Sequence, residues 1–452
     1  MKKPEENLFL RLFCLFSLLI FFCFFSRYIG RDLWFDEALT LLNFASMSNA
    51  AEIYQSYFIP NNQIIHSCFL HYLIHLGIPM EFLRLFPLLC AGITVYTLWK
   101  NFSREFGRIP LAIALAALII SPPFMLYASA LRGYMLAAMF SACALTAAKH
   151  YLLRGKKRYL TGWFISAVLA VGVMPSALAG IAAAGLYAAP YGGKKFLKNR
   201  KIWFLALSSI AGFILFYFPI ADKLLKAFEL KEGWQNVYGA ILAVVIAVVL
   251  TFAVPLVSGI FYHRRHLRNW LRTIIWFIPL ISLFFPVAPF PRVWFVLFPV
   301  FTLLAAGFIS HVPGKQLKII AGTVLLWGSL ICSGFIREHL SPAVTLGGQD
   351  DFYAPRFTRT EFVPSDTARF LRQNFPGHTV FISFDADPWA VMIHNVNVVF
   401  DGPRGRTRQL YSGMPVVLSI RENPEIYADR FNGSLIEIYC NGLHRIYIFQ
   451  MQ

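Results

Sequence analysis

Apolar runs of membrane-spanning length recur along the first three quarters of this chain, and no other feature limits its fold as strongly. A bilayer core about 30 Å thick is crossed by about 20 apolar helical residues, and every backbone polar group inside it must find its partner within the protein. Eleven runs approach or reach this length: 8–26, 82–99, 109–127, 134–152, 159–173, 176–191, 203–220, 237–262, 274–290, 293–310 and 319–335. We therefore predict a polytopic α-helical membrane protein with about eleven transmembrane helices.

Composition agrees with this class and removes one alternative. Hydrophobic residues make up 57% of the chain, and charged residues only 14%. The formal net charge of +18 would suggest nucleic-acid binding in a soluble protein, but most basic residues here lie between the apolar runs. We expect a membrane and no nucleic acid as partner. All cysteines except Cys440 lie in apolar runs, which argues against a disulfide framework.

The basic residues also predict the orientation of the chain. The first run, 8–26, follows Lys2 and Lys3 without a small-residue cleavage site, so we interpret it as a retained span with a cytoplasmic amino terminus. Alternate threading then puts the main basic clusters on the cytoplasmic side. These clusters lie within 100–108, 154–158, 194–201, 264–272 and 315–318. The run 64–78 is short and interrupted by histidines, and we expect it to form a helix in the outer interface.

An odd number of spans leaves the carboxyl-terminal part outside. We predict a transmembrane domain over residues 1–336 and a small external α/β domain over residues 337–452, where the composition becomes polar. Apolar runs there shorten to strand length at 378–384, 396–400, 416–420 and 445–449.

Candidate chemistry lies in the external loops, where ionisable groups near an apolar phase are costly. Asp36 and Glu37 directly follow the first span and are flanked by aromatic residues. Partial desolvation would raise the pKa of at least one of these carboxyl groups, which suits a general base. Alternatively, one of them caps a helix that begins near Ala38.

Four motifs occur in a fixed order on one predicted side of the membrane. They are the Asp36-Glu37 pair, an interfacial helix with Asn and His near its start, the segment 82–87 (FLRLFP) and the segment 127–134 (YASALRGY). Together they resemble the polyprenyl-phosphate-sugar glycosyltransferases with the GT-C fold. The likeness is strongest to the branch containing protein O-mannosyltransferases and lipid A aminoarabinose transferases, and it covers roughly residues 28 to 190.

This resemblance implies an inverting substitution at the anomeric carbon of a sugar carried on a lipid phosphate. Asp36 would be the base that takes the acceptor proton, and Glu37 would tune its pKa or hold the acceptor. Asn61, Asn62 and Tyr134 would contact substrate. The two asparagines follow Pro60, however, and a turn before a helix explains them equally well.

A lipid-phosphate leaving group needs cations in a water-poor site, and arginine can clamp two phosphate oxygens at once. Arg84, Arg132 and Arg292 each lie at the external end of a predicted span. Snorkelling to the interface is the alternative explanation for each of them.

Two departures from the family pattern bear on metal binding. Ala130 stands where many relatives carry Glu, and Gln63 stands where His is frequent. We therefore predict no metal and no cofactor, although a divalent ion is chemically possible. The same departures would suit an inactive member of the family. His71 and His75 have the spacing of a metal-binding pair, but a polar stripe explains them better. A D-x-D motif at Asp385 and Asp387 is interpreted as a turn or cap.

The sequence thus predicts a glycosyltransferase in a bacterial inner membrane. It would move a sugar from a polyprenyl-phosphate donor to a glycan, lipid or protein acceptor at the outer face. A flippase or transporter for a lipid-linked sugar is one alternative, and a non-catalytic acceptor-binding protein is another. A transporter would be expected to show internal repeats or ionisable residues inside the spans. Neither is evident in this sequence, which favours the enzyme.

Overall fold

The computed structural model describes residues 4–57, 62–193, 198–229, 237–262, 272, 274–284, 291–333, 363–400, 410–420, 422–442 and 444–451. The chain forms two compact units, and each draws on two separate parts of the sequence. The first unit contains Met1–Ile29 and Asn49–Ala354, and the second contains Gly30–Ser48 and Pro355–Gln452. The predicted boundary between residues 336 and 337 lies outside the described residues.

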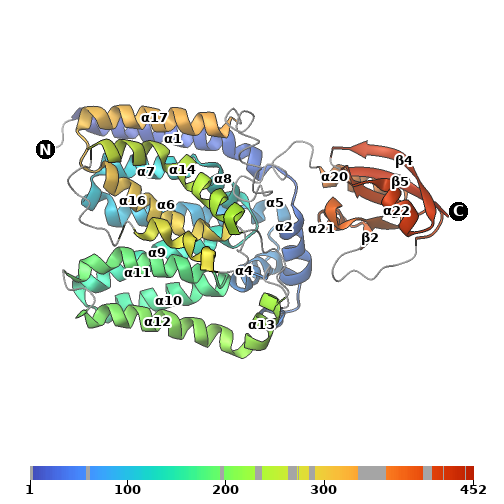
Figure 1. Cartoon of the computed structure of the whole chain (residues 1–452), viewed down its shortest axis with the longest axis horizontal. Helices are drawn as coiled ribbons and strands as arrows, with labels where there is room; N and C mark the ends of the chain where they lie inside the picture. Colours follow the sequence, from blue (N-terminus) through green and yellow to red (C-terminus); the bar gives the residue numbers. More distant parts are fainter. Residues whose placement is uncertain are drawn as a thin grey trace. The chain divides into compact units, whose positions relative to one another are not determined.

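The first unit is a bundle of helices (Figure 1). Each of the eleven predicted apolar runs overlaps one or more of them. In chain order they are α1 (Pro4–Ile29), α3 (Ala50–Gln55), α4 (Ile64–His75), α5 (Met80–Leu83), α6 (Leu85–Phe106), α7 (Arg108–Ile119), α8 (Pro122–Ser129), α9 (Tyr134–Arg154), α10 (Lys157–Val173), α11 (Ala177–Ala188), η2 (Ala189–Gly192), α12 (Arg200–Tyr217), η4 (Phe218–Ile220), α13 (Ala221–Glu229), α14 (Val237–Tyr262), η5 (Ile275–Phe284), η6 (Pro291–Leu297), α16 (Phe298–Ile309) and α17 (Gly314–Cys332).

Within the described residues, 7 helices are long and apolar enough to cross a membrane by themselves, or 8 if α7 and α8 count as one broken span. These two helices meet at an angle of 66°. The shorter apolar helices are α4 and the continuous segment Ala177–Gly192, which joins α11 and η2. The predicted class, a polytopic helical membrane protein, is confirmed. Helix α4 has 12 residues, too few to cross the hydrocarbon core.

Helix α9 lies at the centre of the bundle and packs against α6, α10 and α11. Small side chains permit this close packing. A Cβ atom added to Gly180 of α11 would lie 2.7 Å from Ser141 Oγ on α9 and 3.1 Å from Val296 Cβ on η6. These three elements therefore approach one another at a point where only a glycine fits.

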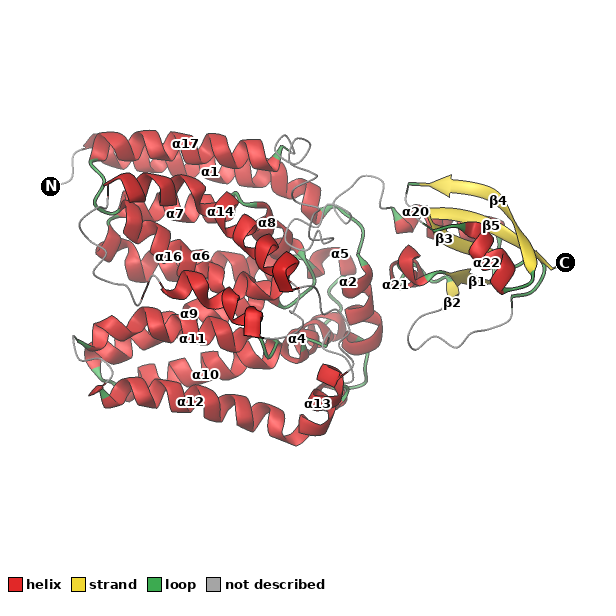
Figure 2. Cartoon of the chain, in the orientation of Figure 1, coloured by secondary structure: helices red, strands yellow, loops and turns green. Residues whose placement is uncertain are grey.

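The second unit is built around a five-stranded sheet with strand order β2-β1-β3-β5-β4 (Figure 2). Strand β1 is parallel to β2 and β3, whereas β5 is antiparallel to β3 and β4. The strands are β1 (Thr379–Ile382), β2 (Asn397–Phe400), β3 (Pro415–Ser419), β4 (Gly433–Asn441) and β5 (His444–Met451). The helical elements are α2 (Phe35–Thr40), η1 (Leu41–Ala45), α20 (Pro364–Asn374), η7 (Phe384–Ala386), α21 (Pro388–Met392) and α22 (Pro424–Arg430).

Alternate residues of the central strands face two separate apolar cores. Val380, Ile382 and Val417 belong to one buried cluster, whereas Phe381 and Val416 belong to the other. This period of two is what a sheet covered on both faces requires. The predicted external α/β domain is thereby confirmed as an α/β fold, and all four predicted strands are present.

Strand β4 was not predicted. Its apolar residues Leu435, Ile436 and Ile438 are interrupted by Glu437, so no apolar run of strand length is visible in the sequence. It lies at an edge of the sheet and pairs only with β5 among the described strands, and Ile436 and Ile438 are exposed. An edge strand needs little apolar burial, which is why hydropathy alone missed it.

Candidate functional site

The predicted acidic pair lies on α2, a short helix that begins at Phe35 and not near Ala38 as expected. Glu37 is fully buried, and both of its carboxylate oxygens accept hydrogen bonds from Arg31, at 2.7 and 3.1 Å. The backbone N–H of Trp34 donates to the same carboxylate at 3.2 Å. Glu37 therefore accepts a hydrogen bond from the backbone N–H of the N-cap residue, as the N3 residue of a capping box does.

Asp36 is in a different environment from its neighbour. Its side chain is half-buried on the first turn of α2, and its backbone carbonyl accepts a hydrogen bond from the Thr40 hydroxyl at 2.7 Å. The π-helical turn η1 directly follows α2, and such turns occur frequently at functional sites. Of the two carboxylates, Asp36 is therefore the less buried.

The three predicted phosphate-binding arginines belong to the first unit. Arg84 lies at the junction of α5 and α6, and its guanidinium donates to the carbonyl of Ile29, the last residue of α1, at 2.7 Å. Arg132 lies in the turn between α8 and α9 with only 2% of its surface exposed. Arg292 is half-buried at the start of η6. Arg84 and Arg132 are buried, so neither extends into solvent as a snorkelling side chain would.

A continuous set of contacts joins the segments that carry Arg132 and Arg292. The guanidinium of Arg132 lies 5.9 Å from the ring centroid of Tyr134. The Tyr134 ring packs on Tyr127 at 5.0 Å, and Tyr127 packs on Phe295 of η6 at 4.7 Å. Tyr134, predicted to contact substrate, is thus a buried member of the aromatic cluster that holds two arginine-bearing segments together.

Helix α4 contacts both the segment that carries Arg84 and the segment that carries Arg132. His66 is fully buried, with its ring centroid 6.0 Å from that of Phe86, two residues after Arg84. The side-chain oxygen of Gln63 accepts a hydrogen bond from the backbone N–H of Gly133 at 2.5 Å. Arg84 and Arg132 are therefore both anchored to the start of α4. We call Arg84, Arg132 and Arg292, with the segments that carry them, the arginine cluster.

His66 was not singled out as a site residue, and only its place in a histidine series marked it in the sequence. Its two ring nitrogens have no hydrogen-bond partner among the described residues. Burial, and then the positive charge of Arg132, lower the pKa of His66 to about 3. The imidazole is therefore neutral at physiological pH and adds no charge beside Arg132. Of the two histidines interpreted as a polar stripe, His71 is buried and His75 is exposed, with their ring centroids 4.0 Å apart.

The predicted asparagines divide between described and undescribed parts of the chain. Asn61 lies outside the described residues. Asn62 is buried, and its amide donates to the carbonyls of Ile53 and Ser56, at 3.0 and 3.3 Å. Its side-chain oxygen accepts from the Ser67 hydroxyl at 3.1 Å. These bonds fasten the segment before α4 to the end of α3, and a role of Asn62 in sugar binding stays a prediction.

No group of three or more His, Cys, Asp or Glu side chains that could hold a metal ion occurs within the described part of the chain. In the D-x-D motif after β1, Asp385 is exposed and Asp387 is buried, so the two side chains lie in different environments. Asp387 takes the left-handed backbone conformation at φ 51° before α21, which fits the predicted turn.

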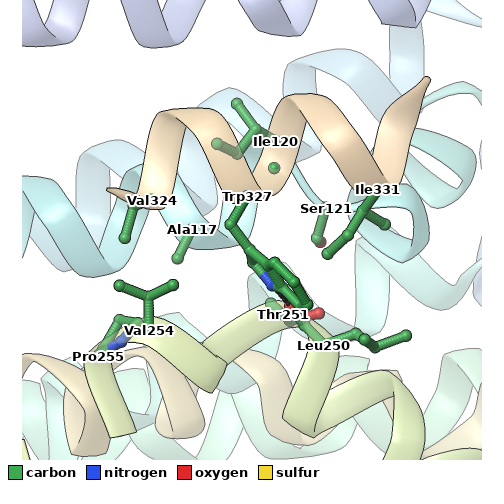
Figure 3. A pocket seen from close by; sticks show the side chains of 11 residues that line it. Ala117, Ile120, Ser121, Leu250, Thr251, Val254, Pro255, Val324, Trp327 and Ile331 are labelled. Carbon is green, nitrogen blue, oxygen red and sulfur yellow. Dashed lines mark hydrogen bonds between the residues drawn. The ribbon is translucent and has the colours of Figure 1, made fainter. Parts of the chain in front are cut away.

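A pocket between α7, α14 and α17 lies apart from these residues (Figure 3). Pro255 lies within α14 there, and the indole N–H of Trp327 donates to the carbonyl of Leu250 at 2.8 Å. The residues that line the pocket include no ionisable side chain. It therefore lacks the groups that phosphate binding or acid–base chemistry requires.

Solved structures that match the chain over nearly its whole length include two of ArnT. No protein-family model matches the chain, and no curated protein matches it. ArnT from Cupriavidus metallidurans in the apo state aligns with a TM-score of 0.62 and 14% sequence identity, over 98% of this chain and 98% of that chain. The same ArnT bound to undecaprenyl phosphate aligns with a TM-score of 0.61 and 13% identity, over 97% of each chain. The chain therefore has the GT-C fold that the sequence resemblance implied, including the carboxyl-terminal α/β unit.

Proposed function

We propose that this protein is a membrane glycosyltransferase that moves one sugar from a polyprenyl phosphate to an acceptor hydroxyl at the outer face of a bacterial inner membrane. The observation that carries the proposal is a GT-C fold shared over 98% of the chain with ArnT, a protein also solved with undecaprenyl phosphate bound. The buried arginine cluster supports it, because guanidinium groups in a water-poor site suit a phosphate.

The proposed reaction is a single displacement. The acceptor oxygen attacks the anomeric carbon while the bond from that carbon to the donor phosphate oxygen breaks, which inverts the configuration. The bonding electron pair leaves with the phosphate, and the acceptor proton passes to Asp36. A positioned base of this kind contributes about 10²–10⁴-fold to the rate. The products are a glycoside and a free polyprenyl phosphate.

The two acidic residues would act differently in this scheme. Asp36 is accessible and can receive a proton, whereas Glu37 is buried and bound to Arg31 through both oxygens. We therefore assign the chemical step to Asp36 and the positioning of α2 to Glu37. The arginine cluster would stabilise the negative charge that develops on the departing phosphate.

The test is donor turnover by the purified protein in nanodiscs. Undecaprenyl-phosphate sugars of several classes are supplied with envelope extract as acceptor, and release of undecaprenyl phosphate is followed by mass spectrometry. Asp36→Asn should lower turnover by about 10²–10⁴-fold. Its amide can still occupy the first turn of a helix, because Asn suits helix amino termini as well as Asp does.

Binding of undecaprenyl phosphate is the control in this experiment. The Asp36→Asn variant should bind that lipid as wild type does, because the substitution leaves the arginine cluster intact. A folded Asp36→Asn protein with normal turnover would remove Asp36 from the mechanism. A wild-type protein that releases no undecaprenyl phosphate from any donor class would refute the transferase itself.

A further inference from the structure

The helix that carries Asp36 belongs to the carboxyl-terminal unit, although its sequence directly follows the first span. Residues Gly30–Ser48 cluster with Pro355–Gln452 and not with the helices that flank them in the chain. Within this unit, α2 packs against α21. More than 300 residues separate the two helices in sequence, so the contact is a tertiary feature of the fold.

Two further contacts join residues 30–48 to the carboxyl-terminal part of the same unit. The first is a helix cap formed by a residue far away in the sequence. The Asp32 carboxylate accepts a hydrogen bond from the backbone N–H of Ser365, the second residue of α20, at 2.9 Å. Pro364 begins α20 and has no N–H, and Val363 before it has no side-chain acceptor. A carboxylate at this place satisfies a backbone N–H that has no partner within the helix. Its negative charge is also stabilised by the positive end of the helix dipole.

The second contact is between two aromatic rings. Phe35, next to Asp36, meets Phe384 edge-to-face with centroids 5.4 Å apart and planes at 64°. Phe384 directly follows the end of β1 in η7. Its position is therefore set by β1, an interior strand of the sheet, and 41% of its surface is exposed. Aromatic pairs of this geometry stabilise a contact beyond the effect of area burial.

The segment between the two contacts is braced internally. Arg31 binds Glu37 through two hydrogen bonds, and its guanidinium lies 4.0 Å from the ring centroid of Trp34. These contacts hold residues 31 to 37 in one conformation. The position of Asp36 therefore depends on the contact of Phe35 with Phe384 and on the contact of Asp32 with Ser365.

We propose that the carboxyl-terminal α/β unit positions the Asp36 carboxylate for sugar transfer, with Phe384 and Asp32 as positioning residues that act through α2. The proposal rests on the proposed function, in which Asp36 is the base. It gives the external unit a part in the chemical step. Misplacing a catalytic group by about 1 Å can cost on the order of 10²-fold in rate.

The principal test compares Phe384→Ala with Phe384→Tyr and with the control Ile426→Ala. Ile426 lies on α22 of the same unit and is also exposed. Phe384→Ala should lower kcat by about 10- to 100-fold with KM for the undecaprenyl-phosphate sugar unchanged. Phe384→Tyr keeps the ring pair and should restore kcat, and Ile426→Ala should match wild type.

A second readout does not depend on activity. Hydrogen exchange of the peptide covering 30–48 should become faster in Phe384→Ala and Asp32→Ala, and stay slow in Asp32→Asn, which keeps an acceptor for the Ser365 N–H. Wild-type kcat in Phe384→Ala, together with unchanged exchange, would overturn the positioning role even if Asp36→Asn is inactive. Normal turnover in Asp36→Asn would instead refute the proposed function, so the two failures are distinguishable.

Discussion

The adjacent carboxylates Asp36 and Glu37 lie in different environments within the first turn of α2. At the second helical position Asp36 is half-buried, whereas at the third Glu37 is fully buried and paired with Arg31. The sequence predicted the importance of the pair and left open which residue caps the helix. The sequence could not identify the capping residue, because the N-cap position is occupied by Trp34 and not by the Ser or Thr that is typical of a capping box.

Arg132 and Arg84 should be the most sensitive of the predicted phosphate ligands. Removing one donor that stabilises a developing oxyanion typically lowers kcat by about 10²–10³-fold. We expect Arg132→Ala and Arg84→Ala each to lose activity on this scale in the undecaprenyl-phosphate release assay. The Lys variants should recover only part of it, because an ammonium group cannot clamp two oxygens.

Folding has to be separated from chemistry for these variants, because Arg84 also binds the Ile29 carbonyl at the end of α1. Thermal unfolding of each purified variant supplies that control. Arg108→Ala is the matched substitution, since Arg108 is an exposed arginine at the start of α7 and outside the arginine cluster. If well-folded Ala variants of Arg84 and Arg132 keep wild-type turnover, neither arginine binds the leaving phosphate.

At the scale of elements, the turn between α8 and α9 depends on close packing around Gly133. A Cβ atom there would overlap Val173 Cγ1 and lie 3.2 Å from both Gln63 Oε1 and His66 Cβ. The backbone of Gly133 has φ −72°, which any residue can adopt. A side chain at this position is therefore disfavoured by steric overlap and not by backbone strain. Adding a methyl group should push the Arg132 segment away from α4.

Gly133→Ala should therefore reduce both turnover and thermal stability. Forcing an extra methyl into a well-packed site typically costs about 1–3 kcal/mol. Gly92→Ala in α6 is the control, because nothing lies within 4 Å of a Cβ at that position and alanine favours a helix. Thermal unfolding and undecaprenyl-phosphate release measure both effects. Equal behaviour of the two variants would show that this packing does not govern the arginine cluster.

Elements were predictable from the sequence to the extent that burial in lipid or in a core selects apolar residues. Helices overlap all eleven apolar runs, and four of the five strands coincide with predicted strands. Strand β4 was not predicted. The contacts of Asp32 and Phe35 with the carboxyl-terminal unit left no such signal. A carboxylate that caps a helix 333 residues away looks, in the sequence, like any other polar residue in a loop.

At the scale of the whole molecule, the predicted orientation in the membrane rests on the distribution of Lys and Arg. The basic clusters between spans predict a cytoplasmic position for Lys157, at the start of α10, and an external position for the carboxyl-terminal unit. The proposed reaction needs Asp36 on the external side. The orientation can therefore be tested separately from catalysis.

Native Cys440 offers a direct test, because it is an exposed thiol on β4. With the other six cysteines replaced by alanine or serine, a membrane-impermeant maleimide should label Cys440 in intact spheroplasts. In a matched protein with Cys440→Ser and Lys157→Cys, labelling should require permeabilised membranes. The reverse pattern would place α2 and its sheet in the cytoplasm, where no acceptor on the outer face could meet Asp36, and the proposed reaction would then have to be abandoned.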